Sequence, residues 1–212
     1  MKINRTPIEG FLVIEPDFFE DERGFFLETY QEQYYKEAGI TDQFVQDNQS
    51  RSCHGVLRGV HFQIKRPQAQ IVTVMRGSVF DVGVDLRPNS ATFGQWHGVE
   101  LSDVGQRQVY MAPGLAHGFC VLSDWVDLHY KVSRFYDPRD ECGLIWNDSE
   151  VNINWPNIVT SINKRDATYS SFLSWIDKNI GSIINRKINK QPEIIIMDVF
   201  NFIIDKVNKV II

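Results

Sequence analysis

The chain has 212 residues, 43% of them hydrophobic and 23% charged, and a formal net charge of −5 at pH 7. This length suits one domain, since all-β domains commonly reach ~200–250 residues, and the composition excludes a disordered or collagen-like chain. The acidic balance argues against general binding of nucleic acid or of an anionic membrane, so any anion site must be a local basic pocket.

The first predicted element is a short helix within residues 29–39, TYQEQYYKEAG. This segment lacks strict alternation of apolar and polar residues and contains helix-forming Glu, Gln, Lys and Ala. It ends at Gly39, and glycine commonly ends a helix. We expect a minor element in a chain that is otherwise rich in strands.

Most of the following chain alternates at period two, which predicts β-strands. In the run WVDLHYKV, for example, Val126, Leu128 and Tyr130 share one face, so Tyr130 is predicted to face the apolar interior. The pattern predicts an all-β fold. The strand-like runs, which Gly, Pro, Asn, Asp and Ser separate, are residues 56–63, 70–86, 97–101, 107–122 and 124–136.

The run VLRGVHFQ, residues 56–63, places a guanidinium and an imidazole inside a predicted strand. Regular alternation would point Arg58 and His61 to opposite faces. A bulge at Gly59 would change this parity, and a glycine inside a strand commonly marks a bulge. We predict that both side chains face the interior, although a structural histidine and a surface arginine are the commoner reading of such a strand taken alone.

From residue 177 the composition changes to an Ile-, Asn- and Lys-rich extension. Its polar residues recur at steps of three and four, which predicts an extra C-terminal helix that begins near Pro192. Charged residues within this segment argue against a membrane span. We therefore divide the chain into a domain, residues 1–176, and an extension, residues 177–212. The extension packs on this protein or on its dimer partner or, alternatively, contacts a membrane surface or another protein.

Cysteine usage and the N-terminal segment predict a cytoplasmic protein. Cys53, Cys120 and Cys142 form no CxxC pair, and their odd number does not suggest a secreted disulfide framework. The N-terminal segment lacks the apolar core of a signal peptide.

Several familiar site motifs are absent from the sequence. The lack of a G-x-G-x-x-G motif, a Walker-type loop and a G-x-S-x-G elbow disfavours dinucleotide redox, nucleotide hydrolysis and α/β-hydrolase chemistry. His117 lies in APGLAHGF at a strand entrance. Neither this run nor VHFQ supplies the close histidine pair of a cupin metal centre, so we expect no functional metal.

Eight segments together carry a resemblance: DERGFFLETY, FVQDNQSRS, VLRGVHFQ, VFDVGVDLRPNSATFGQW, APGLAHGF, LHYKVSRFYDP, GLIWND and INWP. In order and spacing, residues 3–175 resemble the dTDP-4-dehydrorhamnose 3,5-epimerases, and the extension lies outside the resemblance. The resemblance implies a cupin-like jelly-roll barrel with a few short helices. It also implies a homodimer and an epimerase that inverts sugar carbons without metal or organic cofactor.

The resemblance implies catalytic roles for three residues. A 4-keto group makes the hydrogens on C3 and C5 of the sugar acidic, so a base on one ring face and an acid on the other can invert each carbon through an enolate. His61 matches the base and Asp166 the carboxylate that orients it and favours the imidazolium. Tyr130 matches the residue that returns the proton from the opposite face.

Other positions match the residues that bind the nucleotide diphosphate. Arg23 and Arg58 match cations that hold the pyrophosphate, since a guanidinium binds phosphate oxygens bidentately. We expect His117 to line the sugar pocket and Glu141 to lie at the nucleotide end. The remaining positions around the nucleotide are Phe25, Gln46 and Asn48.

Gln70 departs from the family pattern, because members usually have a lysine there that is thought to stabilise the enolate oxygen at C4. A glutamine amide donates only a neutral hydrogen bond, and loss of a strong oxyanion contact typically lowers the rate ~10²–10³-fold. This departure allows three interpretations. Gln70 itself is sufficient, or a nearby cation, Lys65 or Arg66, reaches into the site. In the third, the enzyme acts on only one carbon or on a different nucleotide sugar. The run YMAPGLAHGF also departs from the commoner family sequence, which again indicates a changed pocket.

The sequence therefore predicts a cofactor-independent epimerase that inverts C3, C5 or both of a nucleotide-linked 4-keto-6-deoxy sugar of the dTDP-4-dehydro-6-deoxyglucose type. Its product would serve polysaccharide or deoxysugar biosynthesis. One alternative is a single-site C3 or C5 epimerase that acts on a GDP- or CDP-linked sugar. Another is a catalytically weak cupin that binds sugar nucleotides; retention of His61, Tyr130 and Asp166 counts against it, and Gln70 counts for it.

Overall fold

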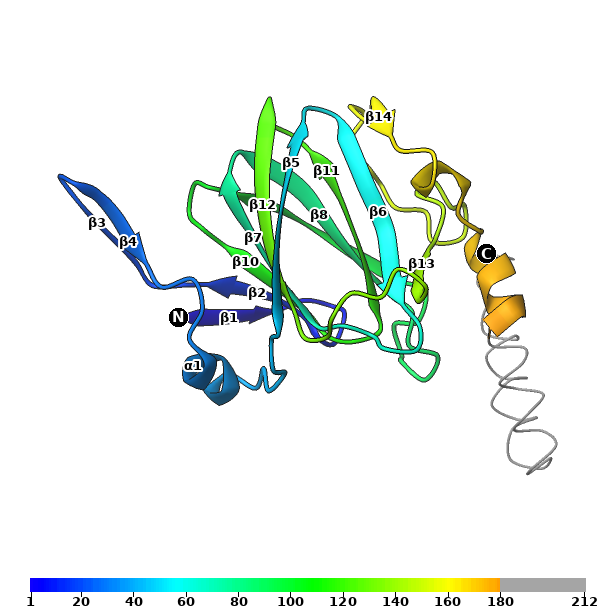
Figure 1. Cartoon of the computed structure of the whole chain (residues 1–212), viewed down its shortest axis with the longest axis horizontal. Coiled ribbons are helices and arrows are strands. Elements are labelled where there is room, and N and C mark those ends of the chain that lie inside the picture. The colour runs from blue at the N-terminus through cyan, green and yellow to red at the C-terminus, as the bar shows by residue number, and fades with distance from the viewer. Residues whose placement is uncertain (180–212) are drawn as a thin grey trace. The chain divides into compact units, whose positions relative to one another are not determined.

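The structure is a computed structural model that describes residues 1–179. It contains a first unit, Met1–Ser170, and a second unit that begins at Ser171. In the first unit two β-sheets pack against each other, as Figure 1 shows. This arrangement, with only short helices, confirms the predicted all-β class.

Each sheet combines strands that are distant in the sequence. The first sheet has the order β1 (Lys2–Arg5), β2 (Phe11–Glu15), β10 (Gln108–Met111), β7 (Gln70–Arg76), β12 (Trp125–Val132) and β5 (Gln46–Cys53). The second has the order β13 (Glu141–Gly143), β6 (Val56–Gln63), β11 (Leu115–Val121), β8 (Ser78–Asp85) and β9 (Trp96–Ser102), with β14 (Ser161–Ile162) beside β6. The five strand-like runs of the sequence all form strands of these two sheets.

Alternation along β12 confirms the predicted parity. Val126, Leu128 and Val132 are buried between the sheets, and Tyr130 packs against the same core while half-buried. Each buried aliphatic side chain contributes about 1.5–3 kcal/mol of burial free energy, so β12 is held firmly in place. Tyr130 consequently points between the sheets from the first of them.

The predicted bulge in β6 is confirmed. Three steps along β6, from Arg58 to His61, match two steps along β11. Gly59 has a φ of 131°, and a Cβ atom there would lie 2.5 Å from the Cα of Gly118, so a residue with a side chain does not fit. Because of the extra residue, Arg58 and His61 turn to the same side of the strand.

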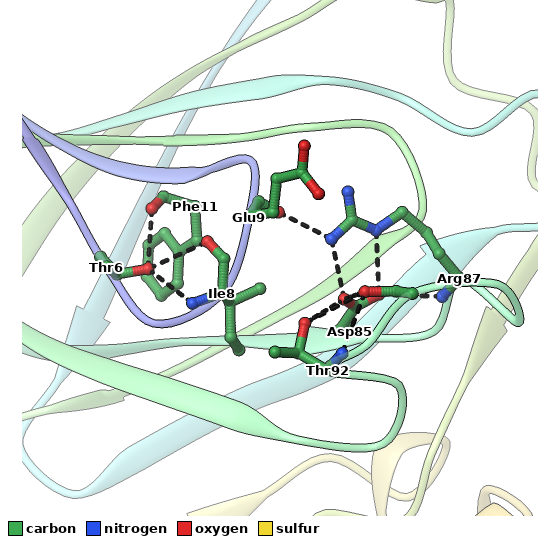
Figure 2. Close-up of polar contacts among 8 residues, drawn as sticks. Thr6, Ile8, Glu9, Phe11, Asp85, Arg87 and Thr92 are labelled. Atoms are coloured by element: carbon green, nitrogen blue, oxygen red, sulfur yellow. Dashed lines mark hydrogen bonds and ion pairs between the residues drawn. The ribbon is translucent and has the colours of Figure 1, made fainter. Parts of the chain in front are cut away.

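Figure 2 shows a cluster of polar contacts at the end of β8. The buried carboxylate of Asp85 accepts hydrogen bonds from the backbone and side chain of Arg87 and from the hydroxyls of Ser90 and Thr92. Arg87 also donates to the carbonyl of Glu9 at 2.7 Å. The cluster therefore ties the segment after β8 to the loop between β1 and β2.

The helix predicted within residues 29–39 is confirmed as α1 (Glu32–Glu37). The side chain of Gln31 accepts a hydrogen bond from the backbone N–H of Tyr34 at its start, and Gly39, with a φ of 90°, follows its end. Tyr35 is buried in an apolar cluster with Ile71 of β7, so the helix covers part of the first sheet.

A two-stranded hairpin, β3 (Phe18–Asp21) and β4 (Gly24–Leu27), was not predicted from the sequence. It reaches away from the two sheets in Figure 1. Four phenylalanines on it are exposed: Phe18, Phe19, Phe25 and Phe26. An isolated hairpin of this size is marginal in water, so its apolar side chains lack the burial that would stabilise it.

Two short helical segments complete the described chain: η1 (Asp166–Thr168), a 3₁₀ helix, and a helix over residues 172–179 in the second unit. The C-terminal helix predicted from Pro192 lies outside the described residues. No helix within residues 1–179 is long and apolar enough to cross a membrane.

Candidate active site

A cavity of about 300 Å³ opens between the two sheets. Strands of both sheets line it, so its walls are positioned by the core rather than by loops alone. Eight of the residues predicted for the site line this one cavity: Gln46, Asn48, Arg58, His61, Gln70, His117, Tyr130 and Glu141.

His61 and Asp166 form the predicted pair at one wall. His61 Nε2 lies 2.9 Å from Oδ1 of Asp166, whose side chain is completely buried. The backbone N–H of Gly59, at the bulge, donates to Oδ2 of Asp166 at 3.1 Å, and Arg165 Nε lies 3.4 Å from Oδ1. Burial raises the pKa of Asp166, but the contacts with His61, Gly59 and Arg165 outweigh it and hold this pKa below its usual value. The group behind His61 is therefore a carboxylate.

Tyr130 lines the opposite wall of the cavity. It belongs to β12 of the first sheet, whereas His61 belongs to β6 of the second. Burial raises the pKa of Tyr130, an effect that the charge of Arg58 only partly offsets. The phenol therefore keeps its proton at neutral pH. The arrangement offers a base on one side of the cavity and a proton donor on the other.

Two polar side chains that the sequence reasoning missed contact Glu141 at the cavity wall. Tyr136 donates to Glu141 Oε2 at 2.7 Å, and Arg165 forms an ion pair with the same carboxylate. Both Tyr136 and Arg165 line the cavity. The available signals were the position of Arg165 directly before Asp166 and that of Tyr136 inside the segment LHYKVSRFYDP. Arg165 gives the site a second guanidinium besides Arg58.

Gln46 and Asn48 on β5 and Arg58 on β6 line the cavity, and each makes hydrogen bonds within the chain. Gln46 Nε2 donates to Asn48 Oδ1 at 2.8 Å. Arg58 Nε donates to the hydroxyl of Ser52 at 3.0 Å, and its Nη2 donates to the carbonyl of Arg51 at 3.4 Å. These contacts fix the orientation of the guanidinium and leave it at the cavity wall.

Gln70 lines the cavity with its side-chain oxygen buried, and among the described residues this oxygen has no hydrogen-bond partner. Lys65 and Arg66 do not line the cavity. Their backbone N–H groups donate to the carboxylate of Asp140 at 2.9–3.0 Å, and both residues are exposed. Their positions therefore do not favour a role for either cation as a replacement for the family lysine.

Arg23 and Phe25 lie outside the cavity of their own chain. Both are on the β3–β4 hairpin; Arg23 forms an ion pair with Asp21, and Phe25 is 59% exposed. The structure therefore does not bring these two predicted residues to the cavity.

Within residues 1–179, no group of three or more His, Cys, Asp and Glu side chains is placed to hold a metal ion. Cys53, Cys120 and Cys142 are all free thiols, and burial raises the pKa of Cys120 to about 11. A thiol with such a pKa is a weak nucleophile at neutral pH. None of the three described cysteines lines the cavity.

Comparisons with known proteins identify the family of the chain. The family model for dTDP-4-dehydrorhamnose 3,5-epimerase matches residues 5–174. A dTDP-4-dehydrorhamnose 3,5-epimerase of Methanothermobacter thermautotrophicus is 47% identical over 152 residues, which are 72% of this chain and 82% of that protein. A dTDP-4-dehydrorhamnose 3-epimerase of Streptomyces niveus is 44% identical over 168 residues, which are 78% of this chain and 81% of that protein.

The fold is similar to that of a solved dTDP-6-deoxy-D-glucose-3,5-epimerase from Legionella pneumophila in complex with dTDP-4-keto-L-rhamnose. That structure is 46% identical, has a TM-score of 0.80, and covers 84% of this chain and 95% of its own. The similarity confirms the predicted cupin-like jelly roll. The chain therefore belongs to the dTDP-4-dehydrorhamnose 3,5-epimerase family, whose members are isomerases.

Proposed function

We propose that the protein is a cofactor-independent epimerase that inverts C3, C5 or both of dTDP-4-dehydro-6-deoxyglucose or a closely related nucleotide-linked 4-keto-6-deoxy sugar. The observation that carries the proposal is the placement of the His61–Asp166 pair and of Tyr130 on facing walls of one cavity. The names of the relatives and the dTDP-sugar bound in the related structure support the substrate class.

In the proposed reaction, His61 removes the proton from the carbon next to the 4-keto group. The electron pair of the C–H bond moves to the C4 oxygen and forms an enolate. Asp166 stabilises the imidazolium that results and holds the ring in place. Tyr130 then protonates the carbon from the other ring face, so the configuration inverts. Exchange with solvent returns a proton to Tyr130 and takes one from His61.

The diphosphate would lie along the polar end of the same cavity. Arg58 and Arg165 both line the cavity, and a guanidinium matches phosphate oxygens bidentately. Glu141 limits the freedom of Arg165, so a bound diphosphate would compete with this carboxylate for the guanidinium. Gln46 and Asn48 supply neutral hydrogen-bonding groups for the nucleoside.

The protein would act as a homodimer in which each hairpin reaches the other chain's cavity. The exposed phenylalanines of the hairpin are of the kind that marks a protein interface. Exchange of the hairpin between two copies would bury them and would bring Arg23 and Phe25 to a nucleotide. A symmetric dimer would complete two identical sites in this way.

Two other functions remain as candidates. Gln70 and the similarity to a 3-epimerase favour inversion at a single carbon, and the first alternative is a single-site C3 or C5 epimerase that acts on a GDP- or CDP-linked 4-keto sugar. Gln70 also favours a weakly active protein that binds sugar nucleotides. The paired His61 and Asp166 argue against the latter, because a binding protein needs no base.

Proton NMR in D₂O tests the proposal. Purified protein is incubated with dTDP-4-dehydro-6-deoxyglucose, and deuterium entry at C3 and C5 is followed separately. Exchange at both carbons is the result expected of a 3,5-epimerase, and exchange at one carbon identifies a single-site enzyme. No exchange with this substrate or with its GDP- and CDP-linked counterparts would refute the proposed activity.

A further inference from the structure

A second, smaller cavity shares part of its wall with the main one. Its volume, about 10 Å³, is close to the smallest that holds one water molecule. Three glutamines line both cavities: Gln63, Gln68 and Gln70. Gln63 is the last residue of β6 in the second sheet, and Gln70 is the first residue of β7 in the first sheet. The small cavity therefore lies where the chain passes from one sheet to the other, next to the candidate active site.

Two buried polar atoms belong to residues that line this small cavity. Nε2 of Gln63 and Oε1 of Gln70 are buried, and neither has a hydrogen-bond partner within residues 1–179. One is a donor and the other an acceptor, yet they are not bonded to each other. Buried polar groups are normally satisfied by the protein or by ordered water, because an unpaired group costs free energy. A single water molecule can accept from Gln63 and donate to Gln70.

Neighbouring contacts determine which end of each amide is available to such a water. The backbone N–H of Asp137 donates to Oε1 of Gln63 at 3.4 Å, so Gln63, which is only 7% exposed, offers its NH₂ group. Nε2 of Gln68 donates to the carbonyl of Arg134 at 2.8 Å, which leaves its Oε1 as an acceptor. One donor and two acceptors match a water molecule, which accepts from the first and donates to the others. A metal cation could not accept from Gln63, and a simple anion could not donate to the two oxygens.

The same water would determine the orientation of Gln70. With Oε1 turned toward the water, the NH₂ group is the end of the amide that remains for the main cavity. In the rotated amide, two NH₂ groups would share the oxygen of the water, and one of its hydrogens would have no acceptor among the three glutamines. The carbonyl oxygen of Gln70 would then face the substrate and repel an enolate. The bridged arrangement therefore keeps a donor directed at the site.

We propose that a buried water molecule bridges Gln63 and Gln70 and holds the NH₂ group of Gln70 toward the main cavity, where it donates a hydrogen bond to the C4 oxygen of the enolate. The inference rests on the proposed function. When His61 removes the carbon-bound proton, negative charge develops on the C4 oxygen, and a donor that is already oriented stabilises it without reorganisation. Gln63 acts through the water and is a positioning residue. A neutral amide held in this way compensates in part for the missing charge of a lysine.

A crystal structure of the protein tests the water directly. We expect one water molecule within hydrogen-bonding distance of Nε2 of Gln63 and Oε1 of Gln70 in the wild type. It should be absent from Gln63→Met, which keeps an unbranched side chain of similar length but has no N–H donor. A direct contact between the two amides, or a wild-type cavity without this water, would overturn the proposal. This result does not depend on activity, whereas a wild-type protein that exchanges no deuterium would refute the proposed function.

Deuterium exchange measures the effect of the bridge on Gln70. Gln63→Met should lower the rate at saturating substrate about 10-fold and leave KM within about twofold, because the lost contact is one that strengthens toward the enolate. In the Gln70→Lys background the same substitution should change the rate less than about twofold, since an ammonium group needs no water to orient an amide. Equal losses in both backgrounds would show a general structural effect and overturn the proposal. Gln43→Met, at an exposed position before β5, is the matched control and should exchange like wild type.

Discussion

The polar cluster around Asp85 allows a quantitative prediction about stability. Both carboxylate oxygens are surrounded by donors: Oδ1 accepts from the backbone and Nε of Arg87, and Oδ2 accepts from Nη2 of Arg87 and from Ser90 and Thr92. In Asp85→Asn, either orientation of the amide would direct its NH₂ group at an N–H group of Arg87, which cannot accept a hydrogen bond. Breaking a buried ion pair typically lowers the free energy of unfolding by ~3–5 kcal/mol. Arg87 is 27% exposed and can recover some hydration, so we expect a loss of about 3 kcal/mol.

The pH dependence of this loss follows from the pKa of Asp85. Burial raises this pKa, but the hydrogen bonds from Arg87, Ser90 and Thr92 lower it further, so it is depressed in the folded protein. Its contribution is therefore complete above the unfolded-state pKa of about 3.9 and is lost as the pH falls through the lower folded-state value. The difference between wild type and Asp85→Asn should be constant from neutral pH down to about pH 5 and should shrink below about pH 4.

Urea unfolding, followed by tryptophan fluorescence at one fixed protein concentration, measures this difference. The concentration is fixed because dimerisation would make the apparent stability depend on it. Asp124→Asn, at an exposed position, is the matched control for the change of charge and should unfold like wild type. A loss below about 0.5 kcal/mol in Asp85→Asn, or a difference that grows as the pH falls, would refute this account of the cluster.

Three further predictions concern the site. His61→Ala should abolish deuterium exchange while dTDP binding, measured by calorimetry, changes only a few-fold; unchanged exchange would remove His61 as the base. Tyr130→Phe should still exchange deuterium but should return the substrate configuration, so NMR would detect exchange without inversion, whereas full inversion would exclude Tyr130 as the acid. Arg23→Ala and His61→Ala, each impaired alone, should recover up to about a quarter of wild-type activity after mixed refolding, because half of the dimers would be hybrids with one intact site. No recovery would place Arg23 at the site of its own chain.

The sequence predicted those features that depend on local pattern. The period-two alternation placed Tyr130 inside, and the glycine in VLRGVHFQ predicted the bulge that turns Arg58 and His61 together. Both are properties of a single strand, which parity and backbone conformation determine. Helix α1 was also predicted from local signals, because its helix-forming residues and the glycine that ends it, Gly39, lie within one short segment.

Features that depend on contacts between distant strands were not predicted. Asp81 reads as one polar residue in an apolar strand, and only the pairing of β8 with β11 brings it to His117, 36 residues away. Arg165 became a candidate only when the chain after β14 was seen to return to the cavity. The β3–β4 hairpin was missed because its exposed phenylalanines do not follow the alternation of a half-buried strand.

The division of the site between two sheets has a consequence for how its specificity can change. Packed sheets lie about 10 Å apart, and the side chains of Tyr130 and His61 extend into this gap from opposite sides, so the sheet separation sets the thickness of the slot left for a sugar ring. That separation is fixed by apolar core residues such as Leu128, which do not line the cavity. A larger or smaller core side chain would therefore change the distance between His61 and Tyr130 across the cavity. Such a change could select between the two carbons of the ring without altering any residue that binds it.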